Sequence, residues 1–94
     1  MNDLELARTL RRLRRTVMML EGDLRHQHMN TALITDIDEQ MERGIASEPR
    51  CAGLRAPVDA LRENTLTPRP ELFGDTIRAC EELQDAIDEV LSRL

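Results

Sequence analysis

Six apolar residues near the N-terminus are spaced alternately four and three residues apart, as are the a and d positions of a heptad repeat. A helix with this spacing buries a narrow apolar stripe against another helix, so the chain must form a helical hairpin, bundle or coiled coil. We call these residues the seam: Leu6, Leu10, Leu13, Val17, Leu20 and Leu24. The rest of the chain contains no catalytic or ligand-binding motif of comparable strength.

The helix that carries the seam is expected to begin directly after Asn2, a residue type that favours the N-cap. Beyond Leu24 the apolar stripe changes phase. This change indicates either a break near residues 29–30 or a rod that continues with a rotated buried face. We favour a near-continuous rod over residues 3–43, because the 21 residues before Gly44 contain neither proline nor glycine.

Two further helices are expected, over residues 50–63 and 71–93, where apolar residues recur at helical spacing. Pro57 should kink the first of these helices or lie close to its true start. The segment TLTPRP, residues 65–70, should form an extended connection, because proline disfavours helical angles in the residue before it. Asp75 is a candidate cap for the last helix.

The expected fold class is therefore all-α, with residues 1–94 forming a single helical domain. A long N-terminal helix should pack with two or three shorter helices as a helical hairpin or small bundle with a coiled-coil-like seam. The core is modest, because the 94 residues include one Phe and no Trp or Tyr. A second copy or a partner would add buried apolar area to so small a chain.

All 13 basic residues are arginines, and the net charge is −5. This acidity makes nucleic acid an unexpected partner, because general affinity for nucleic acids requires a dominant positive field. Arg14 lies beside the seam, where it could pair with the acidic C-terminal segment. Four further arginines project from the opposite face of the helix and form either a charged contact face or an ordinary solvated one: Arg8, Arg11, Arg12 and Arg15.

The sequence contains two pairs of sulfur-containing residues, two adjacent methionines and two separate cysteines, that could be either buried or functional. Met18 and Met19 fall outside the seam. We favour burial of both by another helix of the same bundle over a second interface, because bundle cores use wider stripes than a and d alone. Cys51 and Cys80 lie on apolar stripes and form no CxxC motif, so we expect buried, inert thiols.

His26, His28 and Met29 are candidate ligands of a soft metal such as Cu(I). On a helix, however, the two histidines would point about 200° apart and could not share an ion. We therefore expect neither a metal site nor a cofactor. We also expect no enzymatic activity, because the sequence indicates no set of nucleophile, base and acid.

The favoured hypothesis is a small protein–protein interaction module, such as a bacterial-type adaptor or chaperone-like subunit. It would act through oligomerisation or partner-helix binding along the seam, with the Arg face adding selectivity. A nucleic-acid-binding regulator using the Arg8–Arg15 face and a His/Met metal-binding protein remain alternatives. We expect a cytoplasmic location without membrane contact, because neither a secretory signal nor a long apolar run is visible.

Overall fold

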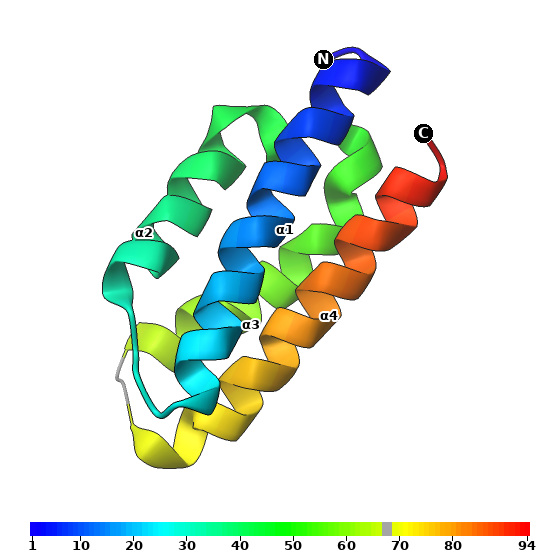
Figure 1. Cartoon of the computed structure of the whole chain (residues 1–94). Helices are drawn as coiled ribbons and strands as arrows, with labels where there is room; N and C mark the ends of the chain where they lie inside the picture. Colours follow the sequence, from blue (N-terminus) through cyan, green and yellow to red (C-terminus); the bar gives the residue numbers. More distant parts are fainter. Residues whose placement is uncertain (67–68) are drawn as a thin grey trace.

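The computed structural model describes residues 1–66 and 69–94, and within these ranges four α-helices form an elongated bundle measuring 39 × 20 × 19 Å (Figure 1). The α-helices are α1 (Asp3–Arg25), α2 (Thr31–Gln40), α3 (Arg55–Leu66) and α4 (Phe73–Ser92). Three short helical segments join them: the π-helical turn η1 (Met41–Ile45) and the 3₁₀ helices η2 (Pro49–Leu54) and η3 (Pro70–Leu72). The all-α fold expected from the sequence is confirmed.

The predicted continuous rod over residues 3–43 is wrong, because α1 ends at Arg25 and a separate helix begins at Thr31. Gln27 has a φ of 59°, a left-handed conformation that turns the chain out of the helix. Asn30 then caps α2, since its side-chain oxygen accepts hydrogen bonds from the N–H groups of Ala32 (3.1 Å) and Leu33 (3.4 Å). The break near residues 29–30, the alternative given by the sequence, is the one that occurs.

The regular part of α2 ends at Gln40, and η1 completes the chain reversal. Gly44 has a φ of 121°, which a residue with a side chain adopts only with strain. Gly44 lies inside η1, where it and Arg43 both leave helical backbone angles, so the helical path of the chain breaks at these two residues.

The starts of the two later helices differ in detail from the prediction. The 3₁₀ helix η2 precedes α3, so Pro57 lies in the first turn of α3, close to the true start of that helix, which is the second of the two predicted alternatives. The helix α4 begins at Phe73 with no side-chain cap, so Asp75 lies inside its first turn and does not cap it. The extended connection expected over residues 65–70 is wrong in its described part, because Thr65 and Leu66 still belong to α3 and Pro70 begins η3. Thr67 and Pro68 lie outside the described residues.

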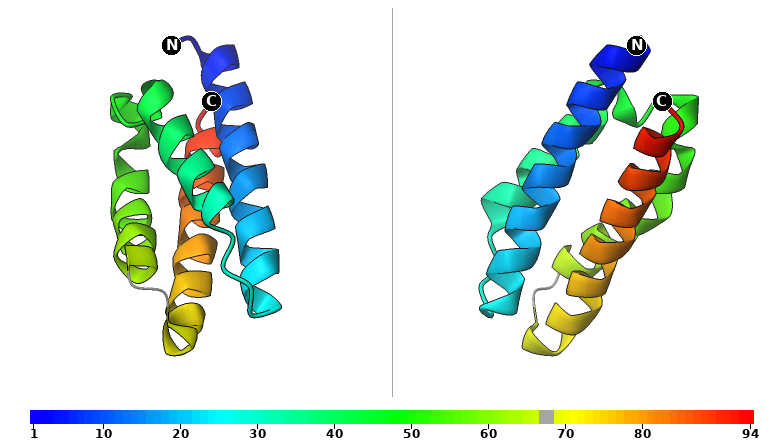
Figure 2. Two further views of the ribbon diagram at one scale, coloured as in Figure 1. Left: turned by 90° about the vertical axis from the view of Figure 1, so that its left-hand side faces the viewer. Right: turned by 45° about the vertical axis from the view of Figure 1, so that its right-hand side comes forward.

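The seam of α1 faces the interior of the bundle. All six seam residues are at most 1% exposed, and they join one apolar core with residues from the other helices. α4 and α2 pack against α1 on either side, and α3 packs against α4 (Figures 1 and 2). At the edge of the seam, Arg14 donates from Nε and Nη2 to the two carboxylate oxygens of Asp88, at 2.8 and 3.1 Å. The expected pairing of Arg14 with the acidic last helix is thus present.

A helix that crosses a bilayer needs about 20 consecutive, mostly apolar residues. Within residues 1–66 and 69–94, no helix combines sufficient length with sufficient apolar character to span a membrane.

Candidate functional site: the outer face of α1

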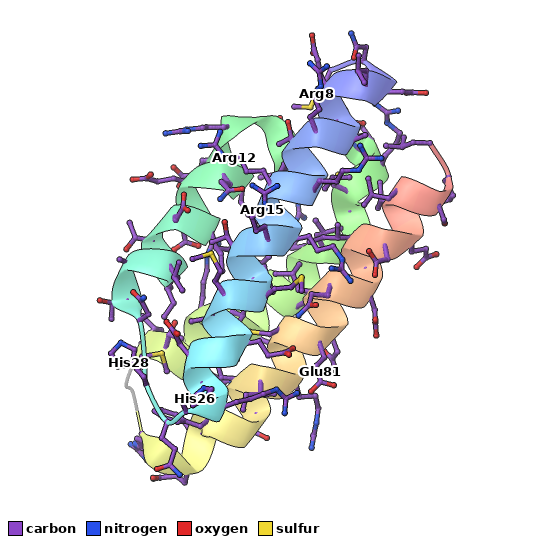
Figure 3. The ribbon with its side chains drawn as sticks, in the orientation of Figure 1. Arg8, Arg12, Arg15, His26, His28 and Glu81 are labelled. Atoms are coloured by element: carbon purple, nitrogen blue, oxygen red, sulfur yellow. The ribbon has the colours of Figure 1, made fainter. Side chains whose placement is uncertain are left out.

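The side of α1 opposite the seam is open to solvent. Arg8, Arg11, Arg12 and Arg15 are all exposed there. Figure 3 shows Arg8, Arg12 and Arg15 following one another along α1. The four arginines span two turns, roughly 10 Å of helix axis at 1.5 Å per residue. The structure therefore brings together all four arginines of the predicted charged contact face.

These four arginines form no ion pair within residues 1–66 and 69–94. Other arginines are matched to acids from distant parts of the chain. Arg62 reaches Asp38 at 2.9 Å, and Arg25 reaches Glu81 at 3.3 Å. Arginines that are three or four residues apart on one helix face repel each other by roughly 0.2–0.5 kcal/mol per pair. The fold thus leaves this repulsion uncompensated on the outer side of α1.

Exposed apolar side chains lie on the same side. Leu4, Met18 and Met19 are 60%, 50% and 55% exposed. The predicted burial of Met18 and Met19 by another helix is therefore wrong, because α2 and α4 flank the seam and do not reach the opposite side. We call this surface the α1 outer face and define it by seven residues: Leu4, Arg8, Arg11, Arg12, Arg15, Met18 and Met19.

The two helices that flank α1 carry acidic side chains. On α4, Glu81 pairs with Arg25 of α1 at 3.3 Å, and Asp88 pairs with Arg14 of α1 at 2.8 Å. On α2, Glu39 is exposed and Asp36 is half-buried. The α1 outer face is therefore a narrow basic strip with exposed apolar side chains at its ends. It lies between two helices, α2 and α4, that are both acidic.

A second feature is a small cleft whose lining comes mainly from η1, η2 and α3. Its volume is about 130 Å³. We call it the η1–α3 cleft, and its lining residues are Met41, Glu42, Ala46, Cys51, Ala52, Arg55, Val58, Asp59 and Arg62. Sequence reasoning missed it, because its wall comes from three separate helical segments and no single motif marks it.

Both cysteines are free thiols and buried. Burial raises the pKa of the Cys51 thiol, and it raises the pKa of the Cys80 thiol to about 12. A raised pKa keeps a thiol protonated at neutral pH and lowers its reactivity. This arrangement supports the interpretation of both cysteines as packing residues.

The candidate metal ligands do not converge. His26 lies at the C-terminus of α1, where its ring Nδ1 is 2.8 Å from the carbonyl oxygen of Gly22. His28 is exposed on the following connection, apart from His26 in Figure 3, whereas Met29 packs partly against the core. In the part of the chain that the structure describes, no three side chains of the His, Cys, Asp and Glu types form a group that could hold a metal ion.

The seam residues cannot serve as an outer binding surface in this folded state, because a single chain buries all six. Fold and surface together define a small all-α bundle with one basic, partly apolar helix face. Comparison of the chain with protein-family models, curated proteins and solved structures gave no match. The α1 outer face and the η1–α3 cleft are the surfaces on which a binding role can be sought.

Proposed function

We propose that the protein is a protein–protein interaction module whose α1 outer face binds an acidic helical segment of another polypeptide. The observation that carries this proposal is the set of four exposed arginines without a carboxylate partner in the described residues, flanked by exposed apolar side chains at either end. An acidic partner would neutralise the repulsion among the arginines, and its apolar residues would cover Met18 and Met19. Methionine adapts its shape to different partners and is common on such surfaces.

The width of the basic strip supports a helix over a nucleic acid. A partner helix is about 10–12 Å across with its side chains, so it can lie along α1 without covering both neighbouring helices. Packed helix axes are about 8–10 Å apart, and a duplex places phosphates on both sides of a groove about 12 Å wide. Phosphates on both sides of α1 would therefore approach the acidic helices α2 and α4.

An adaptor or chaperone-like role in the cytoplasm follows as part of the same proposal. Such proteins hold a segment of another chain and need no catalytic group. Two buried free thiols suit a reducing compartment.

The test is fluorescence anisotropy with a labelled synthetic amphipathic helix that carries Glu on one face and Leu on the other. Replacing Arg15→Glu turns an attraction into a repulsion and should weaken binding by about tenfold. Arg78→Glu is the matched control, because Arg78 is exposed on α4, away from the α1 outer face, and the charge change is identical. Binding that both variants retain equally would contradict the proposal.

A duplex DNA oligonucleotide, titrated in parallel, separates the two partner classes. Met18→Gln with Met19→Gln should weaken binding of the peptide, because its apolar residues lose their contact. The same double substitution would leave DNA binding unchanged, since DNA would be held through arginine–phosphate contacts. Tight DNA binding that ignores the methionines, together with weak peptide binding, would favour the nucleic-acid alternative.

A further inference from the structure

We infer that the η1–α3 cleft of one copy receives the α1 outer face of a second copy, so that identical chains associate head to tail. The inference rests on the proposed function, because it uses the same α1 outer face, but it makes the other polypeptide a second copy of this chain and the binding surface a cleft in place of an acidic helix. It joins two features of the surface, a cleft with an apolar floor and a helix with exposed methionines.

The size of the cleft fits one methionine side chain. Its volume is about 130 Å³, and a cavity of about 150 Å³ with apolar walls is known to hold a benzene molecule of six carbons. A methionine side chain beyond Cα has only four heavy atoms. Met19 is 55% exposed at the C-terminal end of the arginine cluster. The floor of the cleft, formed by Met41, Cys51 and Val58, offers apolar and polarisable contacts to its thioether.

The charges around Met19 and around the cleft also favour the entry of Met19 into the cleft of a second copy. Arg15 lies one helical turn before Met19, so it would reach the rim of the cleft when the methionine enters. Glu42 lies on that rim, is exposed, and forms no ion pair among residues 1–66 and 69–94. We therefore expect an ion pair between Arg15 of one copy and Glu42 of the other.

Three other charged residues line the rim. Arg62 is held by Asp38 at 2.9 Å and by Asp59 at 3.9 Å, so its charge is compensated within the chain. Arg55 has no such partner in the described residues and would repel an incoming arginine. Replacing Arg55→Glu should therefore strengthen the association, and this gain is a direct consequence of the proposed geometry.

The association must be heterologous, because the two surfaces differ and lie on different helices. Such contacts generate rings or open filaments instead of two-fold dimers. A two-fold contact between two α1 outer faces would bring like charges together and is disfavoured electrostatically. The arrangement therefore predicts that each copy has one donor surface and one acceptor surface, which can be inactivated separately.

The experiment is sedimentation velocity of the full chain at low ionic strength, from roughly 1 μM to 1 mM. Wild type should rise above the monomer mass of 10.8 kDa as its concentration increases. A donor variant (Arg15→Glu with Met19→Glu) and an acceptor variant (Ala52→Arg, at an exposed position on the cleft wall) should each remain monomeric. Circular dichroism establishes that both variants fold.

Mixing the two variants is the decisive step. The intact α1 outer face of the acceptor variant can enter the intact cleft of the donor variant, so the mixture should form a capped one-to-one dimer. Two variants that stay monomeric when mixed, or a wild type that stays monomeric at every concentration, would overturn the inference. If the acidic peptide still binds in that case, only the identity of the partner is wrong and the proposed function stands.

The thiols supply a second readout within the same chain. Cys51 lines the cleft, whereas Cys80 lies fully buried in the core. When wild type associates, alkylation of Cys51 by N-ethylmaleimide should slow relative to the donor variant at the same concentration. Alkylation of Cys80 should remain equally slow in both. Equal rates at Cys51 in the associated and monomeric proteins would place the contact elsewhere and overturn the inference.

Discussion

The side chain of Gln40 is buried between α2 and α1 but only half of its amide is hydrogen bonded. Its Nε2 donates to Thr16 Oγ1 at 2.9 Å, and Thr16 Oγ1 in turn donates to the Arg12 carbonyl oxygen at 3.2 Å. The Gln40 Oε1 atom accepts no hydrogen bond from the described residues, although Gln40 is only 5% exposed. Because one half of the amide is bonded and the other is not, substitution of Gln40 and substitution of Thr16 should affect the free energy of unfolding differently.

Gln40→Met should leave the free energy of unfolding unchanged or raise it by about 1 kcal/mol. The substitution loses a hydrogen bond with a net contribution of about 0.5–1.5 kcal/mol, but it also removes a buried unsatisfied acceptor that costs about 1–3 kcal/mol. Methionine matches glutamine in length and helix propensity, and Thr16 keeps its bond to the Arg12 carbonyl. Thr16→Val should instead destabilise by about 2 kcal/mol, because both ends of the buried Gln40 amide are then unsatisfied.

Urea unfolding followed by circular dichroism at 222 nm measures both effects, since the chain has no Trp or Tyr for fluorescence. The two variants should differ by about 2–3 kcal/mol, which corresponds to melting temperatures roughly 8–24 °C apart in a domain of this size. A Gln40→Met variant that is less stable than Thr16→Val would refute the reasoning and indicate that Oε1 has a hydrogen-bond partner in solution.

Three further predictions follow from burial and charge. Leu13→Ala, at a fully buried seam position, should lower the free energy of unfolding by about 3 kcal/mol, and by the same amount at low and high protein concentration. A loss of stability that grows on dilution would place the seam between chains. Arg8→Glu should raise the melting temperature by a few degrees, because it replaces repulsion of Arg11 and Arg12 by attraction; a lower melting temperature would contradict uncompensated charge. Burial raises the pKa of the Cys80 thiol from 9.0 to about 12, so the thiol loses its proton at a lower pH in the unfolded chain than in the folded one. The free energy of unfolding should therefore fall as the pH rises, by about 2 kcal/mol at about pH 10.5. Cys80→Ala should remove most of that fall, and an unchanged pH profile would show another group to be responsible.

The parts of the fold that the sequence predicted are local and repetitive. The seam recurs over several turns of one helix, so its period alone places Leu6 to Leu24 in a helix with a buried stripe. The sequence does not favour a break after Arg25, because the break depends on a left-handed φ at Gln27, and glutamine has no preference for that conformation. Asn30 carried the available signal, since asparagine at that position caps the helix that follows.

The site was predictable to a different extent. The four arginines lie opposite the seam on one continuous helix, so helical geometry alone brings them together. The exposure of Met18 and Met19 required knowing how many helices surround α1, which no pattern within residues 3–25 contains. The η1–α3 cleft required the tertiary arrangement of three segments, and only the folded chain provides that.

The turn that the sequence did not favour also determines which surface is available for binding. A rod over residues 3–43 would be roughly 60 Å long at 1.5 Å per residue, whereas the longest dimension of the bundle is 39 Å. The second half of such a rod would leave Ile37 and Met41 without the core that now buries them. Reversal after Arg25 instead places α2 beside α1, opposite the flank covered by α4. Because both flanks are then occupied, the α1 outer face is the part of the helix left for a partner, and its arginines and methionines are concentrated there.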